Sequence, residues 1–248
     1  MRIFSNKNMC ITFDKFTPSL KYIALRWPLS KYIVKKYVMS NFAKPDLLKL
    51  CTCCLKDLNF RLKLPLVYSL KKLTTVANIN PTYNFYHDCH HLKSVILVSS
   101  IFAKILNLKS HDKFFVVFIA LIHDFNHKGR RTLRKPFYQE KQTINALNGK
   151  VFKHFLNFNK WNRVQRIILN TYFPKIPKTR DDLVEKIILD VDILVSIMFG
   201  IESGQILSKR LKHEQKSVES SNIILKNFLN LVEKRGLHLA ISREACTK

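Results

Sequence analysis

Hydrophobic and polar positions in this chain follow a helical pattern. Long stretches rich in leucine, isoleucine, phenylalanine and lysine run through it, and from about residue 61 the pattern becomes regular. It predicts helices over the following ranges: 86–107, 111–126, 138–157, 160–172, 180–200 and 205–235. Loops are expected at Pro81, over 129–136 and 174–177, and around Gly204, where proline and glycine interrupt the pattern. We therefore expect an all-α fold, a bundle of several helices.

One of these helices contains the longest unbroken apolar run of the chain, "FFVVFIALI" at residues 114–122. Nine residues are too few to cross a lipid bilayer. The run instead suits a helix that is buried on all sides within the bundle.

Residues 1–60 differ from the regular part of the chain. Aromatic residues and lysines are mixed in "SLKYIALRWPLSKYIVKKYV", and Pro18, Pro28 and Pro45 interrupt helices. We expect a helical lead-in that packs on the core, and the alternative is an interaction segment that lies on an anionic membrane surface. The main domain is expected over 61–235, with a frayed tail over 236–248.

The charge balance indicates that a binding partner would be negatively charged. Lys and Arg number 43 against 17 Asp and Glu among 248 residues, which gives a formal net charge of +26. Such a field attracts a phosphorylated small molecule, nucleic acid or an anionic membrane surface. The excess is spread along the chain, so a solvated cationic surface explains much of it. The oligomeric state is left open.

Composition also excludes some classes of protein. Only five glycines occur, and none forms a GxGxxG or GxxxxGK[ST] loop, so there is no phosphate loop of the dinucleotide or P-loop kind. The "CTCC" run at 51–54 has no second ligand pair at zinc-ribbon spacing. With six cysteines and no secretory signal in view, reduced thiols and a cytoplasmic location are expected.

The first candidate for chemistry is a group of histidines in "NFYHDCHHLKSV", residues 84–95. In a helix, His87 and His91 are four residues apart and share one face, whereas His90 points away from that pair. Val95 and Val98 continue the face of His91 towards the core. Imidazoles on a core-facing stripe need partners, because buried polar groups without them are costly.

The second candidate is "FIALIHDFNHKGRR", residues 118–131, where an apolar helix ends at His123, Asp124 and His127. Imidazole and carboxylate groups are ligands of zinc, manganese and iron, and the carboxylate also suits magnesium. The alternative is ordinary polarity at a helix end, where the dipole favours histidine. The basic residues that follow, Lys128, Arg130 and Arg131, could hold phosphate oxygens, or form a solvated loop.

The third candidate is "EKIILDVDILVSIMFGI", residues 185–201, where two aspartates interrupt an apolar helix. A buried carboxylate there needs a cation or hydrogen-bond donors. Asp192 has apolar neighbours at several helical spacings and is the expected ligand. Asp190 is expected on the polar surface of the helix.

Together these segments resemble a known family. His91, His123–Asp124 and Asp192 look like the H…HD…D signature of the HD superfamily of metal-dependent phosphohydrolases. More narrowly, "YHDCHHLKSV" and "ALIHDFNHKG" are similar to the YHNxxHAxDV and ALxHDxDHxG motifs of class I cyclic-nucleotide phosphodiesterases. The resemblance covers residues 80–200 and implies an HD or phosphodiesterase-like bundle around a metal site.

The resemblance also implies a mechanism and its residues. His91, His123, Asp124 and Asp192 would hold the tighter of two divalent cations, zinc together with magnesium or manganese, with iron as an alternative. Asp124 would bridge to the second cation, whose water shell His127 would support. A bridging hydroxide would attack the phosphodiester, and His87 would be the general acid for the leaving oxygen. Glu140 is a counterpart of the family's acidic residue, and Tyr86, the first residue of the first motif, is assigned to substrate binding.

The expected activity is hydrolysis of a 3′,5′-cyclic nucleotide in signal transduction. Some positions depart from the family: Asp88 stands where the family has asparagine, and Gln205 lies in the wrong context for the glutamine that grips the purine. Two alternatives therefore remain. One is an HD hydrolase of another nucleotide or phosphoester, and the other is a catalytically degenerate cationic protein that binds nucleotide or nucleic acid.

Overall fold

The chain folds as an all-helical protein, which confirms the expected fold class. A computed structural model describes residues 19–39, 44–77, 85–129, 135–147, 158–173 and 181–246, and these residues contain helices and no strand. The helices are α1 (Leu20–Leu25), α2 (Lys31–Met39), α3 (Leu47–Asp57), α4 (Leu64–Ala77), α5 (Cys89–Ile105), α6 (Ser110–Ile122), α7 (Tyr138–Leu147), α8 (Phe158–Asn170), α9 (Leu183–Ile197), α10 (Ile201–Gln215), α11 (Ser221–Arg235) and α12 (Ala240–Cys246).

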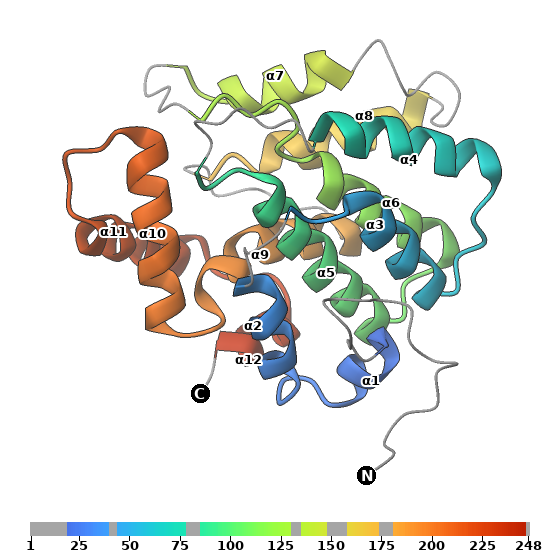
Figure 1. The fold of residues 1–248 in the computed structure, drawn as a ribbon, viewed down its shortest axis with the longest axis horizontal. Coiled ribbons are helices and arrows are strands. Elements are labelled where there is room, and N and C mark those ends of the chain that lie inside the picture. The colour runs from blue at the N-terminus through green and yellow to red at the C-terminus, as the bar shows by residue number, and fades with distance from the viewer. Residues whose placement is uncertain are drawn as a thin grey trace.

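Helix α5 lies at the centre of the bundle, between α6 and α9 (Figure 1). Fourteen of its 17 residues are buried, so neighbours surround it on every side. Asp88 starts this helix, because its carboxylate accepts from the backbone N–H groups of His90 and His91 at 2.9 and 3.0 Å. Helix α6 is buried from Phe115 to Ile122, as its unbroken apolar run predicts.

The lead-in helices belong to the same hydrophobic core as the rest of the chain. Helices α1, α2 and α3 all contact α5, and their apolar residues lie in one cluster with those of α5, α6 and α9. Polar contacts add to this packing, one between the lead-in helices α1 and α3 and one between α2 and α5. The Leu20 N–H donates to Asp57 at 2.9 Å, and the Lys93 ammonium of α5 donates to the Tyr37 carbonyl of α2 at 2.9 Å.

The prediction of a turn around Gly204 was wrong. Gly204 lies inside α10, where the Leu225 side chain of α11 packs 3.1 Å from the position that a Cβ atom would take. The turn occurs at Gly200, whose φ of 95° favours glycine. The helix expected over 205–235 is also two helices, because Lys216 ends α10 in the left-handed conformation and Ser220 caps the start of α11.

The prediction of a frayed tail over 236–248 was wrong for residues 236–246, which include helix α12. Helix α12 packs against α9, and its Ser242 and Ala245 are fully buried. The anchor is Asp190, which is 1% exposed rather than on the surface as expected. Its carboxylate accepts from the backbone N–H groups of His238 and Leu239, each at 2.9 Å, so those two donors compensate its burial.

Other boundaries shift by a few residues. Of the helix expected over 138–157, α7 ends at Leu147, and the rest lies outside the described residues. None of the helices in the described part of the chain has the length and apolar character that a membrane span requires.

Candidate metal centre

Three adjacent helices bring four polar side chains to one point. His91 lies in the first turn of α5, His123 and Asp124 directly follow α6, and Asp192 lies in the middle of α9. Helices α5, α6 and α9 contact one another pairwise, with α5 in the centre (Figure 1). The apolar faces that bury these helices therefore also fix the positions of the four side chains.

The ligand atoms of this cluster have the spacing of a metal site. His91 Nε2 lies 3.3 Å from Asp124 Oδ2 and 3.2 Å from Asp192 Oδ1. His123 Nε2 lies 3.2 Å from Asp124 Oδ2, 3.4 Å from Asp192 Oδ1 and 3.3 Å from His91 Nε2. Ligands about 2.0–2.1 Å from a tetrahedral zinc ion are roughly 3.3 Å apart. The four groups can therefore hold one cation between them.

Hydrogen bonding prepares His123 as a ligand. Its Nδ1 lies 2.9 Å from the carbonyl oxygen of Ala120, which can only accept. The proton of the neutral ring is therefore on Nδ1, and the lone pair of Nε2 points to the cluster. The side chain is fully buried, so the ring has little freedom to turn away.

The electrostatics of the cluster require positive charge. Burial lowers the pKa of His123, but the neighbouring Asp124 carboxylate outweighs burial and raises that pKa well above its ordinary value. Burial raises the pKa of Asp124, yet His123 brings it well below its ordinary value. Protons on the imidazoles or a divalent cation can supply the positive charge that these carboxylates need.

A second cluster lies beside the first and consists of His87, His127 and Glu214. Glu214 accepts from the backbone N–H groups of Tyr86 and His87 at 2.7 and 2.9 Å, and its other oxygen lies 2.5 Å from His87 Nδ1. The His127 ring stacks on the His87 ring at a centroid distance of 3.8 Å. The Nδ1 of His127 accepts from the Gly129 N–H at 3.1 Å.

These contacts give the two histidines of the second cluster different protonation states. Burial lowers the pKa of His87, but the charge of Glu214 outweighs it and raises this pKa to about 9. Burial and the charge of His87 lower the pKa of His127 to about 3. Near neutral pH the cluster therefore holds an imidazolium paired with a carboxylate and a neutral imidazole beside them.

Glu214 is the site residue that the sequence did not reveal. It stands near the end of α10 in the polar run "KRLKHEQK", where a glutamate usually faces water. It is 5% exposed because α10 packs across residues 86–88. Arg210, one turn earlier on α10, pairs with Asp88 at 2.5 Å, so two ion pairs attach this helix to the segment that carries His87.

Tyr86 and Glu140, two other expected site residues, flank the clusters. Tyr86 is buried, and its hydroxyl lies 2.5 Å from Ser196 Oγ of α9. Glu140, in the first turn of α7, is half-buried, and burial together with the charge of Asp124 raises its pKa to about 7. Its buried Oε2 has no hydrogen-bond partner among the described residues.

The expected phosphate-binding residues are only partly described. The Lys128 ammonium donates to Asn126 Oδ1 at 3.3 Å, back onto its own loop. Arg130 and Arg131 lie outside the described residues.

A scan against protein-family models and a search of curated proteins found no match to this chain.

Proposed function

We propose that the chain is a metal-dependent phosphohydrolase and that its substrate is a 3′,5′-cyclic nucleotide. The observation that carries this proposal is the convergence of His91, His123, Asp124 and Asp192, with ligand atoms that all lie within 4.8 Å of one another. These residues are the ones that match the superfamily signature. Their donor set of two imidazoles and two carboxylates fits zinc, manganese or iron.

The four side chains of the first cluster would hold the tighter cation. Asp124 has a second carboxylate oxygen with which it can share a further cation, for which magnesium or manganese is the proposed ion. Bound cations would polarise the phosphodiester and supply a nucleophile from water at neutral pH.

His87 is the proposed general acid. Its Nδ1 is committed to Glu214 at 2.5 Å, which fixes the ring and leaves Nε2 as the atom that can give a proton. Its ring centroid is 5.7 Å from that of His91, so it stands beside the cation ligands without belonging to them. The proton would pass from Nε2 to the departing 3′ oxygen of the substrate.

The remaining residues have supporting roles in this proposal. His127 stacks on His87, and because its Nδ1 accepts from the Gly129 N–H, the proton of the neutral ring is on Nε2 and can be donated to water around the second cation. Lys128 lies near the end of the second motif, Arg130 and Arg131 follow it, and all three would meet the phosphate oxygens. The net charge of +26 favours such an anionic substrate over a neutral one.

We also propose that the reaction takes place in the cytoplasm, as part of cyclic-nucleotide signalling. The cysteines that the structure describes are all free, and three of them, Cys51, Cys54 and Cys89, are buried. Buried thiols without disulfide partners are common in a reducing compartment.

The test is metal analysis combined with a substrate panel. The purified protein should contain bound divalent metal and should hydrolyse cyclic AMP or cyclic GMP with added manganese or magnesium. Asp124→Ala should lose both the metal and the turnover, because it removes a carboxylate that contacts both imidazoles of the site. Asp181→Ala is the matched control, since this side chain is 97% exposed.

The panel also separates the alternatives. Turnover of nucleoside triphosphates or of an aryl phosphodiester, but not of cyclic nucleotides, would support a hydrolase with a different substrate from the one proposed. Full activity in Asp124→Ala would end the enzyme proposal. Metal binding without turnover of any phosphoester would favour a protein that only binds its ligand.

A further inference from the structure

The hairpin formed by α1 and α2, residues 20–39, has an unusual outer face. Three of its large apolar side chains point into solvent: Leu25 is 72% exposed, Leu29 is 78% exposed and Tyr32 is 70% exposed. They follow one another closely, at the end of α1, in the connecting turn and in the first turn of α2. Large apolar side chains exposed together on one short segment often mark a binding site.

The fold does not use these three side chains. The inner face of the hairpin is already filled by Leu20, Ile23, Val34 and Val38, which are at most 6% exposed. The turn is closed by the Ser30 hydroxyl, which donates to the Ile23 carbonyl at 2.7 Å, and by the Ser30 N–H, which donates to the Arg26 carbonyl at 3.0 Å. The hairpin is thus a fixed support that holds its apolar residues outward.

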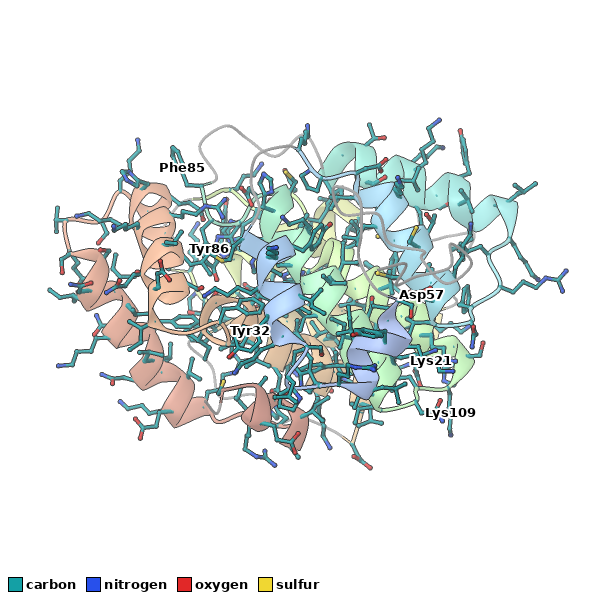
Figure 2. The ribbon with its side chains drawn as sticks, turned by 60° about the horizontal axis from the view of Figure 1, so that its bottom comes forward. Lys21, Tyr32, Asp57, Phe85, Tyr86 and Lys109 are labelled. Atoms are coloured by element: carbon teal, nitrogen blue, oxygen red, sulfur yellow. The ribbon has the colours of Figure 1, made fainter. Side chains whose placement is uncertain are left out.

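Positive charge surrounds the exposed apolar residues. Residues 20–39 contain five cations, Lys21, Arg26, Lys31, Lys35 and Lys36, and no aspartate or glutamate. Lys21 lies one helical turn before Leu25 on α1, and Lys36 one turn after Tyr32 on α2, so each cation shares the outward face with an apolar side chain. Figure 2 looks onto this side of the molecule and labels Lys21 and Tyr32 on the two helices.

We propose that the α1–α2 hairpin docks the protein on an anionic phospholipid surface. Leu25, Leu29 and Tyr32 enter the boundary between headgroups and acyl chains, and the lysines meet the lipid phosphates and carboxylates. Tyrosine suits this boundary because its ring is apolar and its hydroxyl can stay in water. The attachment is peripheral, since the described helices include none that could span a membrane.

The combination of residues favours lipid over the other polyanions. Nucleic acid would use the cations and could stack on Tyr32, but it would leave two exposed leucines without an apolar partner. An apolar groove of another protein would cover the leucines, but it would offer no anionic groups to Lys21 and Lys36. An anionic bilayer satisfies both groups at once.

Vesicle co-sedimentation tests this proposal independently of any enzymatic activity. The full chain should sediment with vesicles of phosphatidylcholine that contain phosphatidylserine, should stay in solution with phosphatidylcholine alone, and should be released by added salt. The variant L25S/L29S/Y32S should bind at least about tenfold more weakly, because its apolar surface is gone. The variant K21E/K36E should also bind at least about tenfold more weakly, since each cation near the bilayer contributes.

Two matched controls remove the same properties elsewhere. V218S/I223S takes exposed apolar side chains from the turn after α10 and from α11, and K226E/K234E reverses two exposed lysines of α11. Both should bind vesicles as the unchanged protein does. Circular dichroism and thermal melting should give the same curves for all variants, because the substituted side chains are exposed.

Several outcomes would overturn the proposal. The first is that the unchanged protein binds neither kind of vesicle, or binds vesicles with and without phosphatidylserine equally well. Another is a hairpin variant that binds as well as the unchanged protein, or a control variant that loses binding to the same extent. If an oligonucleotide bound the chain tightly and displaced it from vesicles through the same lysines, the surface would be assigned to nucleic acid instead.

Discussion

Helix α9 carries two buried aspartates two residues apart, and they serve different regions of the molecule. Asp190 points to the start of α12, where backbone N–H groups of His238 and Leu239 and the His238 ring surround its carboxylate. Asp192 points to the opposite side, where its Oδ1 lies 3.2 and 3.4 Å from the imidazoles of His91 and His123. The Asp190 region has enough donors by itself, whereas the Asp192 region contains a further carboxylate and needs positive charge, either from protonated imidazoles or from a bound cation.

This difference distinguishes a structural carboxylate from a ligand. A structural carboxylate is satisfied by donors fixed in the backbone, and its removal costs folding free energy. A ligand carboxylate is placed beside other ligand atoms, and its removal costs the affinity for the cation. The two aspartates of α9 therefore offer a direct experimental comparison.

The largest effect is expected from Asp192→Ala. Loss of a direct ligand should weaken metal binding by more than the roughly 100-fold that loss of a supporting hydrogen bond causes, and phosphodiester turnover should fall with it. Metal analysis after dialysis against a chelator measures this loss. If Asp192→Ala kept its metal while Asp190→Ala lost it, the assignment of the two aspartates would be reversed.

His87→Ala should separate the two clusters from each other. The first cluster keeps its four ligand atoms, so metal content should not change, whereas turnover should fall by about 10²–10⁴-fold for a lost general acid. The measurement is kcat for a cyclic nucleotide alongside metal content. His111→Ala is the matched control, because that imidazole is 63% exposed at the other end of α6. A loss of metal in His87→Ala would mean that His87 is a ligand.

Asp190→Ala should show the opposite behaviour to Asp192→Ala. It leaves buried donors at the start of α12 without an acceptor, which should cost about 3 kcal/mol of unfolding free energy. Thermal melting would measure this as a decrease of roughly 10 °C in Tm. The metal content per folded molecule should stay as it was, and a variant that melts like the unchanged protein would refute the structural role.

The smallest effect is expected from Glu214→Gln, a change in a positioning residue. The glutamine keeps the shape of the side chain but loses the charge, so turnover should fall by about 10–100-fold. Since the Glu214 carboxylate raises the pKa of His87, its loss lowers that pKa. A general acid works only while protonated, so the rate should begin to decline at a lower pH than in the unchanged protein.

The pH profile of kcat measures this shift, and Glu214→Asp, which restores the charge, should recover part of it. An unshifted profile in Glu214→Gln would show that Glu214 supports the fold alone.

The sequence predicted those features that local pattern controls. The apolar run of α6 predicts its burial, because its composition leaves no polar face. The four candidate ligands could be selected because each is a polar residue beside apolar sequence: His91 shares a face with Val95 and Val98, His123 and Asp124 end an apolar helix, and Asp192 interrupts one. Their order along the chain resembles an H…HD…D signature, and the helical pattern alone would not supply that order.

The sequence could not reveal features that depend on contacts between distant elements. Asp190 and Asp192 have similar apolar neighbours in the chain, and only the position of α12 separates their surroundings. Glu214 lies in a polar helix whose pattern predicts exposure, and it is buried by the segment 86–88, more than 120 residues earlier. Gly204 resembled a turn residue, but the space that it leaves is filled by Leu225 from the next helix.

The two ion pairs of α10 have a mechanical consequence. Helices α5, α6 and α9 carry the candidate cation ligands, but the orientation of the His87 ring depends on α10 through Glu214, and Arg210 of the same helix pairs with the neighbouring Asp88. The proposed proton donor and the candidate cation ligands are therefore supported by separate parts of the bundle. In the proposed mechanism, a small tilt of α10 would withdraw His87 from its working position and leave the four candidate ligands in place, so the proposed hydrolysis would stop without any loss of metal.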